Sequence, residues 1–123
     1  MVELSDEQFE RIVAKALDDM PAWISQRMQN VAIVIHPWPT PQQIQTSQKE
    51  GKMLLGLYEG IPLTRRGHAY RLVAPDRITL FQQPLQRAAR DKKDLIRLIR
   101  RTVVHEIGHH FGLSEKDLNN LGV

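Results

Sequence analysis

The sequence contains no cysteine. A disulfide framework and a thiolate metal site are both excluded, so any protein-bound metal must be held by histidine and carboxylate side chains. No apolar stretch approaches the length that spans a bilayer, and the acidic residues 1–7 lack the apolar run of a secretion signal. From these absences we expect a cytoplasmic protein that does not enter a membrane.

Length and composition are ordinary for a globular protein. The chain has 123 residues, of which 41% are hydrophobic and 25% are charged, and its formal net charge is +3. A chain of this length can bury one sizeable hydrophobic core but not two. We therefore expect a single domain over residues 1–123.

A basic stretch over residues 87–101 supplies much of the positive charge. Such a stretch can bind nucleic acid or attract acidic substrates. Asp91 and Asp94 interrupt it, however, and no aromatic residues lie between the basic ones to stack on bases. We therefore favour a solvated helix face, and a nucleic-acid binding domain that uses this face is the weaker hypothesis. On a helical projection this face points away from the two histidines considered next and carries Lys93, Arg97, Arg100 and Arg101.

The most informative pattern is H-E-x-x-H, formed by His105, Glu106 and His109. Histidines four residues apart project from one side of a helix, so both imidazoles can bind one ion. A catalytic zinc usually takes three protein ligands and one water, and a carboxylate beside the first ligand can take a proton from that water. The alternative is a structural coincidence, in which two helical histidines bind no metal.

The residues around the motif favour the metal site. Residues 94–104 have helical periodicity, and Gly112 stands where a left-handed residue can end the helix and turn the chain back. Glu115 follows three residues later and is the natural third ligand. Asp117 lies two residues further on and could take its place, because glutamate and aspartate both bind zinc.

Local patterns in the first half of the chain predict two helices and one strand. Residues 5–8 form a capping box, which opens a helix to about residue 19. Proline suits a first helical turn, so a short helix should follow over residues 21–28. The β-branched run at 30–35 predicts a buried strand, and the proline-containing residues 38–52 predict an exposed loop.

The second half predicts two short strands and two helices. Residues 53–58 and 77–82 have strand character, Gly56 marks a bulge or a close backbone approach, and flanking prolines indicate that the second strand lies near a sheet edge. Asp91 caps the long helix that carries the motif, and Ser114 caps a last short helix. This order predicts an α+β fold in which the helices pack on one small mixed sheet, with the metal site on the long C-terminal helix.

The motif and its continuation resemble the zincin metallopeptidases, whose extended pattern is H-E-x-x-H-x-x-G-x-x-H or D. His105, Glu106, His109 and Gly112 match this pattern, and Glu115 occupies the last position, where the family has histidine or aspartate. No methionine follows the glycine, so the Met-turn of the larger metzincins is absent. The chain is similar in particular to the small bacterial minimal-zincin metallopeptidases, over residues 21–35, 54–63, 75–81 and the last helix.

This resemblance implies a minimal zincin-like fold and a zinc-dependent peptidase activity. His105, His109 and Glu115 would bind zinc, and Glu106 would take the proton of the attacking water. An edge strand near residues 77–81 would bind a peptide or unfolded protein by strand addition. The chain has no room for what a full-sized zincin adds after its third ligand, so a protein partner could complete the cleft.

Two hypotheses from different classes remain open. The first is a zinc metallopeptidase, for which Tyr58, His68 and Tyr70 are candidate helpers at the oxyanion. The second is a non-catalytic metal-binding module that acts through interactions, which the unusual Glu115 and the missing lower part of the cleft favour. Loss of activity in Glu106→Gln with retention of zinc would separate them.

Overall fold

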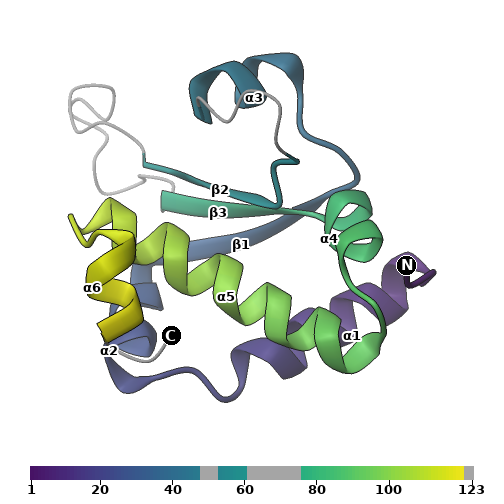
Figure 1. Ribbon diagram of the computed structural model, residues 1–123, viewed down its shortest axis with the longest axis horizontal. Helices are drawn as coiled ribbons and strands as arrows, with labels where there is room; N and C mark the ends of the chain where they lie inside the picture. The colour runs from purple at the N-terminus through teal and green to yellow at the C-terminus, as the bar shows by residue number, and fades with distance from the viewer. Residues whose placement is uncertain (48–52, 61–75, 121–123) are drawn as a thin grey trace.

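The computed structural model of the protein describes residues 1–47, 53–60 and 76–120 (Figure 1). Within them lies a three-stranded sheet in the order β1-β3-β2. β1 (Val31–His36) runs parallel to β3 (Asp76–Phe81), and β2 (Gly56–Glu59) runs antiparallel to β3. Helices pack around this sheet, so the fold is α+β with a small mixed sheet, as the sequence predicts.

The predicted helix starts are confirmed. Ser5 and Gln8 form the capping box: Ser5 Oγ accepts the Gln8 N–H at 3.2 Å, and Gln8 Oε1 accepts the Ser5 N–H at 2.9 Å. The second helix begins directly after Pro21. The helices of the described residues are α1 (Asp6–Leu17), α2 (Ala22–Arg27), the 3₁₀-helix η1 (Met28–Asn30), α3 (Pro41–Ser47), α4 (Gln82–Ala88), α5 (Lys92–His110) and α6 (Glu115–Asn120).

Helix α5 is the element around which the core forms. Figure 1 shows it crossing the molecule beneath the sheet, with α1 beside its first half and α6 at its far end. Asp91 caps it, because its Oδ1 accepts the Asp94 N–H at 2.8 Å. The side chains that α5, the sheet and the neighbouring helices bury together are mostly aliphatic, as an apolar core requires. They include Phe9, Ile24, Ile78, Leu80, Leu85, Leu95, Ile99, Val103, Ile107 and Leu118.

Two of the helices are not predicted by the sequence. The expectation of an exposed loop is wrong for α3, which Thr40 starts with a capping pair: its Oγ1 accepts the Gln43 N–H at 3.1 Å, and Gln43 Oε1 accepts the Thr40 N–H at 2.9 Å. α4 holds Pro84 in its first turn, where the missing N–H has no helical partner to lose. In both helices the proline lies in the first turn, so it does not break the helix.

The expectation that β3 lies at a sheet edge is also wrong. β3 pairs with β1 on one side and with β2 on the other, so Ile78 aligns with both Ile33 and Tyr58. Pro84, one of the residues that suggested an edge, lies beyond the strand in α4. A peptide cannot add to β3, because both of its edges are already paired.

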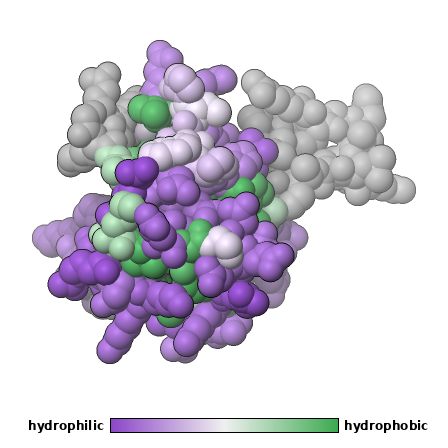
Figure 2. All heavy atoms as spheres, turned by 90° about the vertical axis from the view of Figure 1, so that its right-hand side faces the viewer, coloured by the Kyte–Doolittle hydropathy of each residue, from purple (hydrophilic) through white to green (hydrophobic). Residues whose placement is uncertain are grey.

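Most of the face shown in Figure 2 is hydrophilic, and apolar atoms reach the surface there only in small areas. Several large apolar side chains are nevertheless exposed on the molecule, namely Met1, Trp38, Ile44, Met53 and Phe111. Among the described helices, none is both long enough and apolar enough to cross a membrane.

Candidate metal centre

The end of helix α5 determines how the chain returns to the two histidines. Gly112 has a φ of +85°, the left-handed conformation that the sequence predicts. The Leu113 N–H donates to the Gly108 carbonyl at 2.8 Å, and the Gly112 N–H donates to the His109 carbonyl at 3.0 Å. These two bonds define a Schellman motif, which closes a helix and redirects the chain. No heavy atom of the described residues lies within 4 Å of the Cβ position at Gly112, so the backbone conformation is what requires glycine there.

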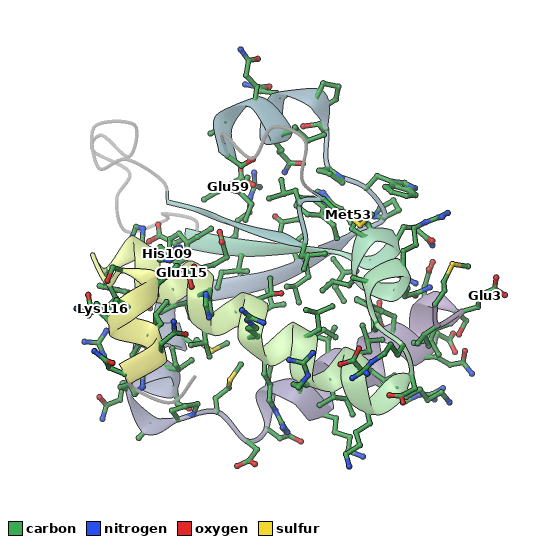
Figure 3. All side chains as sticks on the ribbon, viewed as in Figure 1. Glu3, Met53, Glu59, His109, Glu115 and Lys116 are labelled. Atoms are coloured by element: carbon green, nitrogen blue, oxygen red, sulfur yellow. The ribbon has the colours of Figure 1, made fainter. Side chains whose placement is uncertain are left out.

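Helix α6 docks on α5 through one buried side chain. Leu118 is fully buried, and Gly108 provides the room for it, because a Cβ at Gly108 would lie 2.6 Å from Leu118 Cδ2. Figure 3 shows the result: Glu115, the first residue of α6, lies next to His109 where α5 ends. A turn that requires one glycine and a docked helix that requires another therefore bring Glu115 back to the motif.

His105, His109 and Glu115 form a three-residue cluster. One nitrogen or oxygen atom from each lies within 4.8 Å of the other two. Glu115 Oε1 is 3.1 Å from His105 Nδ1 and 3.1 Å from His109 Nε2. Ligand atoms of a tetrahedral zinc lie about 3.3 Å apart, as follows from metal–ligand distances of about 2.0–2.1 Å. The chemistry and spacing of these donors therefore fit a divalent ion such as zinc.

The electrostatics of the cluster favour an ionised carboxylate. Partial burial acts to raise the pKa of the Glu115 carboxyl, but the hydrogen bond to His105 and the charges of His105, His109 and Arg101 together hold it below its ordinary value. The Glu115 side chain is 60% exposed, so solvent screens these charges, whereas the His105 side chain is only 12% exposed. His105 Nε2 is buried without a hydrogen-bond partner among the described residues, so Nδ1 is the nitrogen that faces the cluster. An ionised carboxylate is the form in which glutamate binds a metal.

Asp117, the alternative third ligand, has a different position. Its Oδ2 accepts the Ser114 N–H at 2.9 Å, and Ser114 Oγ accepts the Asp117 N–H at 3.1 Å. This reciprocal pair is the cap of α6 that the sequence predicts. The two acidic side chains thus have different contacts: Glu115 contacts the histidines, and Asp117 takes part in the helix cap.

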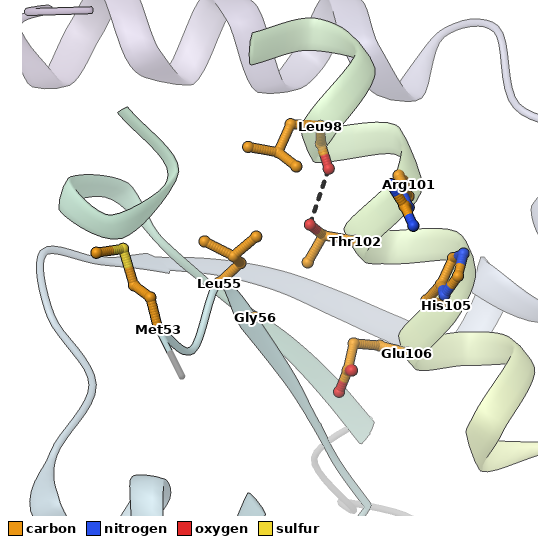
Figure 4. Close-up of a pocket in the computed structure, with 8 residues that line it drawn as sticks. All are labelled: Met53, Leu55, Gly56, Leu98, Arg101, Thr102, His105 and Glu106. Carbon is orange, nitrogen blue, oxygen red and sulfur yellow. Dashed lines mark hydrogen bonds between the residues drawn. The ribbon is translucent and has the colours of Figure 1, made fainter. Parts of the chain in front are cut away.

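Glu106 extends from α5 toward β2 (Figure 4), where its Oε1 accepts the Tyr58 N–H at 2.9 Å. Alternate residues of an antiparallel strand direct their N–H groups away from the partner strand. The Phe81 N–H donates to the Leu55 carbonyl, so Leu55 and, two residues later, Leu57 direct their backbone groups toward β3. The Tyr58 N–H therefore points to the opposite side, the outer edge of β2. Within the described residues, Glu106 Oε2 accepts no hydrogen bond.

Of the three candidate helpers, the structure describes only Tyr58. Its ring stacks on His110 with centroids 3.9 Å apart, and its hydroxyl donates to Asp76 Oδ2 at 2.8 Å. Burial, the hydrogen bond to Asp76 and the charge of Asp76 raise the pKa of Tyr58 to about 12. Tyr58 therefore ties β2 to α5 and β3 through its side chain and orients Glu106 through its backbone. His68 and Tyr70 lie outside the described residues.

A pocket of about 210 Å³ opens beside His105 and Glu106 (Figure 4). The Thr102 hydroxyl donates to the Leu98 carbonyl at 2.8 Å, which leaves the threonine methyl to face β2. A Cβ at Gly56 would lie 2.7 Å from that methyl carbon, so the close backbone approach predicted at this glycine is confirmed. The remaining walls are largely apolar and come from Met53, Leu55 and Leu98.

Arg101 also lines this pocket, which corrects its expected position away from the histidines. Four residues of α-helix rotate by only about 40° beyond a full turn. Arg101 and His105 are four residues apart and therefore share one side of α5, as Figure 4 shows. The spacing between them was the signal in the sequence that could have placed Arg101 at the site.

The chain belongs to the zincin-like metallopeptidase family, since the sequence profile of that family matches residues 28–123. The matched region contains the whole histidine and glutamate cluster. The chain is also similar to a conserved hypothetical protein from Thermus thermophilus, with a TM-score of 0.57 and 23% identity over 96% of this chain and 97% of that one. At this identity the likeness shows a shared fold. Among curated proteins, none matches the chain.

Proposed function

We propose that this protein is a zinc-dependent metallopeptidase in which His105, His109 and Glu115 bind the ion and Glu106 is the general base. The main support is the cluster itself, three donors within 4.8 Å of one another on a chain of the zincin-like metallopeptidase family. A zinc ion bound there would polarise the scissile carbonyl and lower the pKa of a water molecule. The donors are two imidazoles and one carboxylate, a set that suits zinc.

The hydrogen bond that Glu106 accepts supports its proposed role in proton transfer. The Tyr58 N–H holds its Oε1 at 2.9 Å, so the carboxylate has a defined orientation. Its Oε2 is then the atom that takes a proton from the attacking water and later passes it to the leaving amine. A carboxylate held by a backbone amide keeps this orientation before substrate arrives, which removes part of the entropic cost of the step.

The outer edge of β2 is the proposed place for an extended peptide, in place of the strand expected from the sequence. β2 is an edge strand among the described residues, and Glu106 lies against this edge at Tyr58. Gly56 directs its backbone groups to the same edge, because it is two residues from Tyr58. The Tyr58 N–H is already donated to Glu106, so a peptide that pairs here would use the backbone groups of Gly56 and run past Glu106, which fits strand addition by an unstructured segment.

The test compares cleavage of an unfolded protein such as reduced, alkylated casein by the parent and by Glu106→Gln. Both proteins should bind about one zinc, whereas turnover by the variant should fall about a hundredfold or more, the usual range for loss of a general base. Glu10→Gln is the matched control, since Glu10 is an exposed residue of α1 outside both the cluster and β2. A variant that cleaves as fast as the parent would contradict the role of Glu106.

A non-catalytic metal-binding module is the second candidate. It is favoured by a glutamate where the family has histidine or aspartate, and by the 60% exposure of that side chain, which leaves the third ligand loosely enclosed. A parent protein that retains zinc but cleaves neither unfolded proteins nor a varied peptide set would support this function. A protein partner that covers the open side of the cluster would then be the object to identify.

A further inference from the structure

Arg101 differs from the neighbouring arginines of α5 in its contacts with the described residues. Arg97 pairs with Asp94 at 2.8 Å, and Arg100 Nε donates to the Ala16 carbonyl at 2.9 Å. Arg101 is exposed, and within the described residues it forms no ion pair and no hydrogen bond. No described residue uses its five N–H donors, so they can bind a ligand.

The pocket beside Arg101 has the chemistry of a site for a short chain that ends in an anion. Its apolar walls come from Met53 and Leu55, which precede β2, and from Leu98 of α5, and about 210 Å³ is room for one side chain. Arg101 supplies the cation on the side of His105, whereas Glu106, the acidic residue of the lining, turns toward the Tyr58 N–H (Figure 4). An aliphatic stem can pack on these walls while its carboxylate reaches the guanidinium.

The charges around Arg101 add to this preference. Arg97, Arg100 and Arg101 line an adjoining pocket in which Asp19 is the acidic residue. With Asp94, the partner of Arg97, the sum of three cations and two anions is still positive, and such a surface attracts carboxylates before they dock. The charge of Arg101 also helps to lower the pKa of Glu115, so the guanidinium lies close enough to the proposed metal site to interact with it electrostatically.

We propose that Arg101 binds a carboxylate of the substrate next to the scissile bond, either the side chain of an aspartate or glutamate or the free C-terminus of the peptide. This inference rests on the proposed function and names the substrate class for that site. Four helical residues advance by about 6 Å, which is roughly the span of two extended peptide residues. Arg101 therefore lies within reach of the residue that follows a peptide bond held at His105.

Binding to zinc-loaded Glu106→Gln protein tests the proposal without turnover. The first probes are acetylated hexapeptide amides of alanine and leucine in which one glutamine is replaced by glutamate, at each position in turn. The second probes are an acetylated tetrapeptide of the same residues as the free acid and as the amide. One carboxylate probe should bind about five- to tenfold more tightly than its neutral partner, a size between that of an exposed ion pair and that of a charge-assisted hydrogen bond. The pair that shows this difference identifies the source of the carboxylate.

Variants of α5 then assign the preference to one residue. Arg101→Gln in the same background should reduce the ratio to within about twofold, and Arg101→Lys should retain part of it, because lysine keeps the charge but not the bidentate geometry. Lys93→Gln is the matched control: it removes one positive charge from the same helix, and Lys93 lines neither the pocket beside His105 nor the adjoining pocket. A ratio that survives in Arg101→Gln, or equal affinity of all paired probes including no binding by any, overturns the proposal.

Cleavage assays with protein that retains Glu106 test this proposal and the proposed function separately. If the protein is a peptidase, kcat/KM should show the same ratio between paired peptides and lose it in Arg101→Gln. Cleavage without any such ratio would refute the carboxylate site and leave the peptidase intact. A ratio in binding that depends on Arg101, in a protein that cleaves nothing, would refute the peptidase and leave the carboxylate site intact.

Discussion

Gly108→Ala should weaken metal binding, although Gly108 is not one of the three proposed ligands. The new Cβ would lie 2.6 Å from Leu118 Cδ2 and 3.3 Å from Leu118 Cγ. Carbon atoms in contact rest about 3.5–4.0 Å apart, so the two groups must separate by about 1 Å. Leu118 is fully buried in a close-packed core, so we expect α6 to move and to carry Glu115 with it.

The expected magnitudes differ for stability and for metal affinity. Overpacking a core costs about 1–3 kcal/mol, while alanine is favoured over glycine inside a helix by about 1 kcal/mol. The free energy of unfolding of the metal-free protein should therefore fall by about 0–2 kcal/mol. Zinc affinity should fall about tenfold or more, because changes that misorient a ligand typically cost 10–100-fold.

The assay is zinc competition against a chromophoric chelator, with urea unfolding in EDTA as the measure of stability. Leu118→Val supplies the compensating change, since it removes one methylene where Gly108→Ala adds one carbon. The double variant should recover most of the zinc affinity, and the cycle should show a favourable coupling between the two sites. Unchanged affinity in Gly108→Ala, or a double variant that binds no better than the single one, would refute the idea that docking of α6 positions Glu115.

Two further predictions concern single side chains. Glu115→Gln should lower zinc affinity at least about tenfold, whereas Asp117→Asn keeps a cap acceptor and should stay within about twofold; the reverse order in the competition assay would make Asp117 the ligand. Tyr58 should titrate near pH 12 by tyrosinate absorbance, and Tyr58→Phe should remove that step. Because its folded pKa exceeds the ordinary 10.0, its contribution to stability is complete below pH 10 and is lost as the pH rises through 12. Titration of Tyr58 near 10 would contradict its burial against Asp76.

The sequence predicts well what a few consecutive residues determine. The capping box at Ser5, the cap at Asp91 and the left-handed Gly112 each depend on atoms within about four residues. The segment between His109 and Glu115 contains such a local turn at Gly112, which explains why the sequence spacing alone predicts that Glu115 lies near the two histidines. Docking of α6 then depends on Gly108, a residue that the helix pattern alone gives no reason to notice.

What the sequence does not predict depends on pairing between distant segments. β3 is central because β1 and β2 both pair with it, and no property of residues 76–81 by themselves distinguishes a central strand from an edge strand. The hydrogen bond from Tyr58 to Glu106 joins residues 48 positions apart. Arg101 is a different case, since helical geometry already placed it beside His105.

The three proposed ligands and Glu106, the proposed base, are therefore positioned by different parts of the molecule. The cluster depends on α5, one left-handed turn and the docked α6, all within residues 105–118. Glu106 depends on β2, which approaches α5 closely enough at Gly56 that a Cβ there would meet the Thr102 methyl carbon at 2.7 Å. A change in α6 should then alter the zinc affinity and leave the orientation of Glu106 unchanged, because the Tyr58 N–H still donates to that carboxylate. A change that moves β2 should act on Glu106 and leave the three proposed ligands in place, so mutations should separate the proposed metal binding from the proposed turnover.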